Sequence, residues 1–225
     1  RHNRRARHRH DGVARAQNPA GHRFDESGLW EKTKFMGNEY CNKTLGVIGM
    51  GRVGTVVADR PIGLKMNFIA HDPFIAPEVA EKMGVKMVSM DELYANSDFI
   101  TVHSPLAPET RNLVNEESFA KMKKGVFLIH CARGGIVNEK ALYDALKSGK
   151  VAGAAIDVFE EEPTKNMDLI GLENVICTPH LGASTDEAQT NVAIAIAHQI
   201  ATYFATGEIK GAVNFPSVST DVMAV

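Results

Sequence analysis

The sequence has few cysteines, and their arrangement excludes two classes of small protein. Three occur among 225 residues, Cys41, Cys131 and Cys177, an odd number with wide spacing. A disulfide framework needs paired cysteines and a zinc site needs closely spaced ligands, so neither is expected. We therefore predict a cytoplasmic protein from a reducing compartment.

Long apolar runs and a strong net charge are also missing. No stretch of about 18 apolar residues occurs, so we expect no membrane-spanning helix and no membrane partner. No secretory signal is visible, because the first ten residues are basic rather than apolar. The formal net charge of −2 gives the whole chain no attraction to nucleic acid, and we predict no nucleic-acid partner.

The first seventeen residues differ in composition from the rest. The opening segment, RHNRRARHRH, is rich in arginine and histidine. This composition is typical of a disordered tail, and it could also be a basic arm that contacts nucleic acid. A third hypothesis is a frameshift near residue 17, because one codon choice for residues 7 to 17, read one nucleotide later, spells an apolar helix pattern. Codons that cannot be read in this way would end that hypothesis.

From residue 44 onward, short apolar runs alternate with helical patterns. The runs are rich in valine and isoleucine and predict buried parallel strands. Predicted strands lie at 44–50, 67–73, 85–88, 98–105, 126–132, 151–159 and 174–180, and predicted helices at 52–66, 76–84, 90–97, 115–125 and 138–150. This alternation predicts an α/β fold with a doubly wound parallel sheet, the Rossmann arrangement.

A long helix is predicted at the end of this series, over residues 184–208. Ser184 and Glu187 form a capping-box pattern at its start, and Gly207 stands at its predicted end. The run NVAIAIAHQIATYF between them is apolar nearly all round, so we expect this helix to be buried against this domain and a further element.

Pro61 opposes the pattern of the first predicted helix. It falls about two turns into that helix, where a proline removes a backbone hydrogen bond and clashes with the preceding turn, at a cost of about 3 kcal/mol. We predict a kink or an early helix end.

The segment GMGRVG sets Gly49, Gly51 and Gly54 in the G-x-G-x-x-G spacing between a predicted strand and a predicted helix. Gly49 permits the tight turn, Gly51 lets the backbone approach a pyrophosphate, and Gly54 lets helix and strand pack closely. The helix N-terminus offers N–H groups and the positive end of its dipole to the phosphates. We predict a dinucleotide site; a glycine-rich turn without a ligand is the alternative.

Asp72 ends the second predicted strand, eighteen residues after Gly54. A carboxylate there suits the two ribose hydroxyls of NAD and would repel the additional phosphate of NADP, so NAD is the predicted cofactor. Asp72 could instead form a turn before Pro73.

Three polar residues at predicted strand ends indicate a reaction: Arg133 in HCARGGIVNE, Glu162 in DVFEEEP and His180 in CTPHLGAST. Arginine can hold a small substrate's carboxylate, histidine can accept a hydroxyl proton while hydride leaves, and a neighbouring carboxylate fixes the imidazole. Together they fit the oxidation of a 2-hydroxy acid or the reverse reduction. Asp157 could hydrogen-bond the nicotinamide. Taken singly, His180 could be a satisfied polar residue, Glu162 part of a solvated loop, and Arg133 a structural partner of Glu162.

The sequence resembles the D-isomer-specific 2-hydroxyacid dehydrogenases over roughly residues 18 to 217, in the segments GMGRVG, HDP, HCARGGIVNE, AAIDVFEEEP and TPHLGAST. The resemblance implies an oxidoreductase in which Arg133 anchors the substrate carboxylate, Glu162 pairs with the catalytic histidine, and His180 is the general acid/base. It implies NAD contacts, besides the three glycines, at Arg52, Val53, Asp72, Ser104, Cys131, Ala132, Asp157 and the turn from His180 through Gly182 to Ala183. The segment GLWEKTKFMG, with Trp30, resembles one that reaches across the family's dimer interface, which implies a homodimer or higher homo-oligomer.

The chain also departs from the family's pattern. Family members usually carry Asn at His130, Thr at Ser104 and a helix former at Pro61; Ser104 keeps the hydroxyl, whereas the bulkier His130 could disturb its strand. The family's substrate-binding domain normally precedes this region, and we expect this chain to lack it. We therefore expect a basic tail at 1–17, an NAD-binding domain at 18–183, a long helix at 184–208, and a tail at 209–225 that would return to the substrate domain.

We therefore predict that this chain binds NAD but has little or no turnover alone. Catalysis needs reacting groups held within fractions of an ångström, and a cleft without the substrate-binding domain does not provide that. Two alternatives share the same residues. One is an NAD-sensing interaction module of the co-repressor type, and the other is a non-catalytic remnant that only dimerises.

Overall fold

The computed structural model describes residues 37–82 and 84–212 of the chain. The predictions for residues 1–17, for the Trp30 segment and for the tail beyond residue 212 lie outside the described residues. The distribution of contacts divides the chain into two units, Arg1–Pro179 and His180–Val225.

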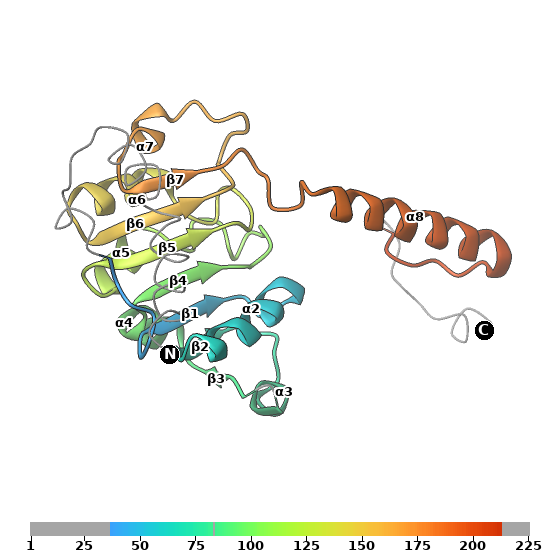
Figure 1. The fold of residues 1–225 in the computed structure, drawn as a ribbon, viewed down its shortest axis with the longest axis horizontal. Coiled ribbons are helices and arrows are strands. Elements are labelled where there is room, and N and C mark those ends of the chain that lie inside the picture. The colour runs from blue at the N-terminus through green and yellow to red at the C-terminus, as the bar shows by residue number, and fades with distance from the viewer. Residues whose placement is uncertain (1–36, 83, 213–225) are drawn as a thin grey trace, which may run out of the picture. The chain divides into compact units, whose positions relative to one another are not determined.

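Seven strands form one sheet in the first unit (Figure 1). They are β1 (Thr44–Ile48), β2 (Asn67–His71), β3 (Lys86–Met87), β4 (Phe99–Val102), β5 (Val126–His130), β6 (Val151–Ile156) and β7 (Val175–Cys177). Their order is β3-β2-β1-β4-β5-β6-β7, and each neighbouring pair is parallel. The chain therefore builds the sheet outward from β1 in both directions, which confirms the predicted doubly wound α/β fold.

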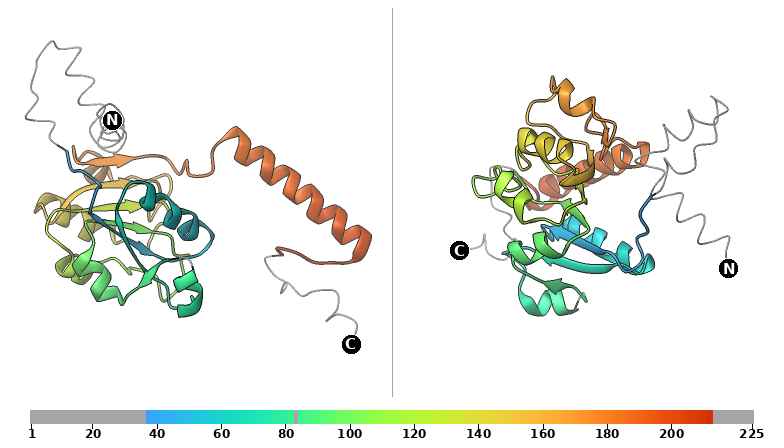
Figure 2. Two further views of the ribbon diagram at one scale, coloured as in Figure 1. Left: turned by 60° about the horizontal axis from the view of Figure 1, so that its bottom comes forward. Right: turned by 90° about the vertical axis from the view of Figure 1, so that its left-hand side faces the viewer.

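Helices connect these strands and cover both faces of the sheet. They are α2 (Arg52–Gly63), α3 (Pro77–Lys82), α4 (Met90–Asn96), α5 (Glu116–Lys121), α6 (Glu139–Lys147) and the short α7 (Met167–Ile170), which the sequence reasoning did not predict. Figure 2 shows α2 on one face of the sheet and α4, α5 and α6 on the other. This is the layer arrangement in which every strand can be apolar on both sides.

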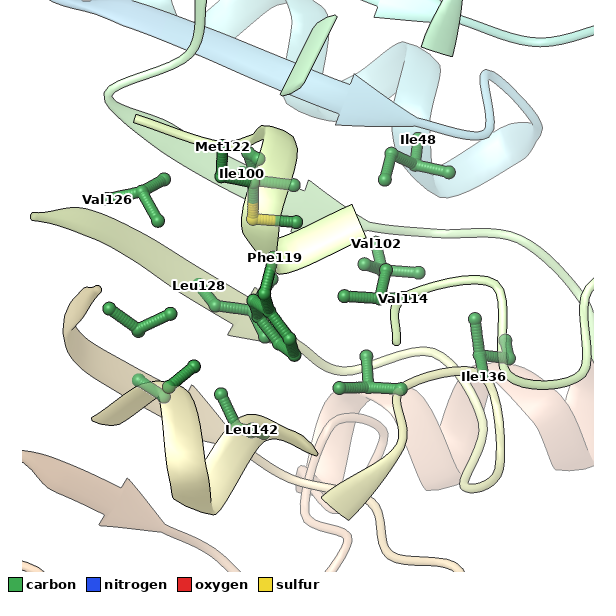
Figure 3. Close-up of a cluster of buried hydrophobic side chains, with 14 of the residues drawn as sticks. Ile48, Ile100, Val102, Val114, Phe119, Met122, Val126, Leu128, Ile136 and Leu142 are labelled. Carbon is green, nitrogen blue, oxygen red and sulfur yellow. The ribbon is translucent and has the colours of Figure 1, made fainter. Parts of the chain in front are cut away.

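Two apolar cores result from this layering. Val47 and Ile48 are consecutive in β1 and point to opposite faces, yet each is at most 1% exposed. Val47 belongs to a smaller cluster with Ala58 of α2, whereas Ile48 belongs to the larger cluster under α4, α5 and α6. Figure 3 shows this larger cluster, in which Phe119 of α5 packs beside side chains of β4 and β5. The continuous apolar character of β1 is thus explained by burial on both faces.

Helix α2 includes Pro61 and ends at Gly63, two residues further on. The predicted range extended to Met66, so the helix ends three residues earlier than its pattern suggested, although not at the proline itself. A proline lacks the N–H that would bond the carbonyl one turn earlier, and a position in the last turn leaves few further bonds to disturb.

The second unit contains helix α8 (Asp186–Thr206), whose N-cap corrects one prediction. Its N-cap is Thr185, whose hydroxyl accepts from the Ala188 N–H, and not Ser184; Gly207 closes it as predicted, with a φ of 73°. None of its residues is buried within its own unit, so the expected burial of α8 against this domain and a further element stays a prediction. The helix has no other described helix or strand in its own unit against which to pack. Among the described helices, α8 included, none is long and apolar enough to cross a membrane.

Candidate functional site

The functional candidates of the first unit gather at one edge of the sheet. Each follows the carboxyl end of a strand, and parallel strands bring those ends to the same edge. Gly49 follows β1, Asp72 follows β2, Ser104 follows β4, Arg133 follows β5 and Asp157 follows β6. The sheet thus brings together residues that are more than a hundred positions apart in the sequence.

The glycines of the first turn differ in the space around them. Gly49 has a φ of +91°, and a Cβ there would lie 2.8 Å from the Ser104 nitrogen. A Cβ on Gly54 would lie 2.1 Å from the Gly49 carbonyl oxygen, so close packing of α2 on β1 requires glycine. A Cβ on Gly51 would meet nothing within 4 Å. The geometry supports the backbone roles predicted for Gly49 and Gly54, and a side chain at Gly51 would enter open space. Contact of Gly51 with a pyrophosphate stays a prediction.

The start of α2 is prepared for an anion. The Thr55 hydroxyl donates to the carbonyl oxygens of Met50 at 3.1 Å and Gly51 at 2.9 Å, which ties the turn to the first turn of the helix. That first turn holds no acidic residue, and Arg52 and Val53 are exposed. No acidic side chain of α2 itself therefore neutralises the positive end of the helix dipole.

Asp72 supports the turn that it was predicted to serve. Its Oδ2 accepts from the Met50 N–H at 2.7 Å, and its Oδ1 accepts from the Phe74 N–H at 2.8 Å. The second bond confirms the turn-forming interpretation of this aspartate. It leaves the ribose role open, because each carboxylate oxygen has a second lone pair.

The remaining cofactor candidates of this unit lie at the same edge of the sheet. The Ser104 hydroxyl is 3.4 Å from the Ile48 carbonyl oxygen. Asp157 is 5% exposed and accepts a short bond from the Thr178 hydroxyl, at 2.5 Å. Cys131 is a free cysteine whose side chain is partly desolvated, and this desolvation together with the charge of Asp157 raises its pKa. Its neighbour Ala132 is 8% exposed. Sequence reasoning missed Thr178, although its position after β7 signalled that it would face this edge.

Arg133 is exposed and forms no ion pair with any carboxylate of the described residues. Its Nη1 donates at 2.7 Å to the carbonyl oxygen of Ala132, the residue before it. The structural interpretation, in which Glu162 neutralises Arg133 to hold the fold, is therefore wrong for this part of the chain. A cation held by its own loop at the edge of the sheet is available to an anionic ligand.

The loops of Arg133 and Glu162 are in direct contact. A Cβ on Gly134 would lie 1.7 Å from the Phe159 carbonyl oxygen, so the two backbones touch at a glycine. Glu162 in turn accepts from the Phe159 N–H at 3.1 Å. The two predicted catalytic residues thus project from one packed pair of loops.

His180, Gly182 and Ala183 belong to the second unit, which begins at His180. His180 has a φ of 54° and is exposed. The structure describes these three residues within their own unit, and the predicted pairing of His180 with Glu162 stays a prediction.

His130 is the residue whose environment sequence reasoning did not foresee. It keeps regular pairing with Val102 and Ile156, and the register irregularity of β5 lies at its other end, between Val126 and Phe127. The suspicion that His130 disturbs its strand is therefore wrong. The imidazole is 3% exposed, and neither ring nitrogen has a hydrogen-bond partner. Burial lowers its pKa to about 4.

Comparison with known proteins gives the arrangement a context. A family model described as the NAD-binding domain of D-isomer specific 2-hydroxyacid dehydrogenases matches residues 12–182. A curated relative from Archaeoglobus fulgidus, named D-3-phosphoglycerate dehydrogenase, is 51% identical over 201 residues, which are 89% of this chain and 38% of the relative. The chain therefore spans less than two fifths of that relative's length.

Solved structures resemble the chain in the same way. A glyoxylate reductase from Paecilomyes thermophila superposes with a TM-score of 0.80 at 35% identity, covering 89% of this chain and 61% of that one. An NAD-dependent formate dehydrogenase from Staphylococcus aureus, solved in complex with NAD, gives a TM-score of 0.77 at 31% identity, with the same coverage of 89% and 61%.

Proposed function

The chain belongs to the D-isomer specific 2-hydroxyacid dehydrogenases, and from this premise we propose that it supplies the cofactor site and reacting side chains of an enzyme that oxidises 3-phospho-D-glycerate to 3-phosphohydroxypyruvate in serine biosynthesis. The observation that carries the proposal is Arg133, an exposed guanidinium held at the sheet edge by its own loop. The substrate is proposed from the curated relative, which is named D-3-phosphoglycerate dehydrogenase.

The residues at the first turn fit NAD, the cofactor of the family's domain. Backbone N–H groups at the start of α2 would bind the pyrophosphate over Gly51, where a side chain would otherwise fill the space. Asp72 would accept hydrogen bonds from the ribose hydroxyls through its remaining lone pairs. Asp157 and Ser104 would contact the nicotinamide end. When bound, NAD supplies the hydride acceptor for the C2 hydrogen of the hydroxy acid.

The protein's part in the reaction is to bind, orient and move one proton. Arg133 would hold the substrate carboxylate with its two-pronged guanidinium. The imidazole of His180 would take the proton of the C2 hydroxyl as that carbon becomes a carbonyl, and would return it in the reverse reduction. Glu162 would favour the imidazolium that forms and fix the ring's orientation.

We also propose a cytoplasmic homodimer or higher homo-oligomer. Support for association comes from the exposed apolar side chains of α8. Support for a reducing compartment comes from the three free cysteines. The proposed divisions are the NAD-binding domain at 18–183, the long helix at 184–208 and flanking tails at 1–17 and 209–225.

A titration with NADH, followed by nicotinamide fluorescence, tests the cofactor site. We expect saturable binding that weakens at least about tenfold in Asp72→Ala, because a charged acceptor is lost. Asp72→Asn is the matched control, since it keeps an oxygen for the Met50 N–H while removing the charge. Failure of a folded chain to bind NADH would contradict the proposal and favour the remnant.

An assay with 3-phospho-D-glycerate and NAD tests the reaction. The full-length relatives extend well beyond this chain, so we expect saturable NADH binding with little or no turnover until a substrate-binding domain is supplied. Turnover restored by that domain, and abolished again by Arg133→Ala, would support the enzyme. NADH binding that never leads to turnover would favour the interaction module.

A further inference from the structure

His130 occupies the last position of β5, three residues before Arg133. The alternation of side chains along the strand places it on the face of Val126 and Leu128, which is the face covered by α5 and α6. His130 as a whole is only 3% exposed. His130 is therefore a buried residue at the point where β5 ends and the Arg133 loop begins.

The imidazole is held without satisfied hydrogen bonds. Neither Nδ1 nor Nε2 has a partner in the described structure, although a neutral imidazole carries one donor and one acceptor. Orphaned polar atoms are rare in protein interiors, and those that occur commonly bind a water molecule. The Arg133 backbone interacts with the ring, but its geometry does not reach that of a hydrogen bond.

A small pocket adjoins His130. It is lined by His130, by Gly134 and Gly135 of the Arg133 loop, and by the carboxylates Glu139 and Glu160, with apolar side chains closing the rest. Its interior has space for about one water molecule. Among the described residues no group of three or more His, Cys, Asp or Glu is placed to hold a metal ion, so the pocket suits water better than a cation.

The two glutamates that line the pocket, Glu139 and Glu160, hold two segments of the chain together. The Glu139 N–H donates to Glu160 Oε1 at 3.1 Å, and the Glu160 N–H donates to Glu139 Oε1 at 2.7 Å. This reciprocal pair fixes the start of α6 to the segment after β6. A water in the pocket would therefore lie between β5, the Arg133 loop and this pair.

We propose that His130 binds one buried water molecule in this pocket and through it positions the loop that carries Arg133. His130 is thus a positioning residue that does not itself touch substrate. The catalytic consequence rests on the proposed function of Arg133, whereas the water site and its effect on the loop do not.

A crystal structure of the chain, together with amide hydrogen exchange, tests the proposal without cofactor or substrate. We expect a water within hydrogen-bond distance of a His130 ring nitrogen. In His130→Leu we expect no water, and roughly tenfold faster exchange at the amides of Arg133, Gly134 and Gly135, because one hydrogen-bonded link is lost. His130→Asn keeps a donor and an acceptor, so exchange at these three amides should be slower than in His130→Leu.

Leu128→Val is the matched control, because it weakens the same face of β5 without touching the pocket. It should change exchange only as far as global stability changes. A dry pocket in the wild-type crystal, or loop exchange in His130→Leu no faster than in the control, would overturn the proposal. If His130→Leu does not fold, the wild-type pocket and His130→Asn decide: a dry pocket, or an Asn variant without water at the same place, overturns it. A wild-type chain that fails to bind NADH would contradict the proposed function and leave these readouts unchanged.

Discussion

At the scale of single residues, Gly51 and Gly54 lie three positions apart and have opposite surroundings. We predict that Gly54→Ala destabilises the fold by about 1 to 3 kcal/mol, because its Cβ would overlap the Gly49 carbonyl oxygen. Gly51→Ala should leave the free energy of unfolding nearly unchanged, because nothing lies within 4 Å of the new Cβ. It should weaken NADH binding at least about tenfold, because the methyl group would occupy the pyrophosphate's place.

Urea unfolding and NADH titration of both variants separate these effects. Gly63→Ala, which also has open space around the added carbon, is the control for adding a methyl group to α2. Unchanged NADH affinity in Gly51→Ala would show that the turn does not bind the pyrophosphate.

Also at the residue scale, His130 should make stability depend on pH. Its pKa is about 4 in the folded state against 6.5 for an ordinary histidine, so the unfolded chain binds more protons between these limits. The free energy of unfolding should therefore fall as pH falls from 6.5 toward 4, by about 2 kcal/mol at pH 5 from this group alone. Among the titratable groups nearby, Glu139 and Glu160 line the pocket, and His103, whose own pKa burial lowers, disfavours a second positive charge.

Urea unfolding at pH 7.5 and pH 5 measures this dependence. His130→Asn should lose the His130 contribution while keeping that of His103 and the carboxylates. Equal pH slopes in the wild type and in His130→Asn would contradict a lowered pKa of His130 in the folded protein.

At the scale of elements, α2 carries an avoidable cost at Pro61. The proline cannot donate to the Val57 carbonyl one turn earlier, so Pro61→Ala should restore that bond. We predict a gain of about 1 to 2 kcal/mol in the free energy of unfolding, reduced by the greater freedom of the unfolded alanine chain. Thermal and urea unfolding would measure it, with NADH affinity unchanged as the control. A loss of stability would show that the proline fits the last turn better than a helix former.

At the scale of the whole molecule, the exposed apolar surface of α8 should drive association between chains. Phe204 is 81% exposed and contacts the Tyr203 ring, so Phe204→Asp should lower the free energy of unfolding by only about 0.5 to 1 kcal/mol. It should nevertheless weaken self-association, because a charge would have to be buried in the contact. Sedimentation over a range of concentrations measures the monomer and the associated form of the wild type and of the variant. Glu208→Asp, just beyond the helix, is the matched control, and equal association of Phe204→Asp and wild type would place the contact elsewhere.

The sequence alone was sufficient for the class of fold and for the first turn of the cofactor site. The alternation of apolar strands and helices follows from local periodicity, and the glycine spacing reports backbone needs that only glycine meets at Gly49 and Gly54. The same local logic placed Gly207 at the end of α8 and Arg133 at a strand end.

Tertiary structure decided what depends on neighbours distant in the chain. The strand order, the burial of His130 and the contact of Gly134 with Phe159 arise from pairing and packing between segments, which no local pattern encodes. The observed N-cap of α8, Thr185, differs by one residue from the predicted Ser184. Two adjacent hydroxyl residues could each cap the helix, and backbone geometry selects Thr185. The burial expected for α8 stays a prediction, because apolar composition indicates a need for a packing partner that the described part of its own unit does not supply.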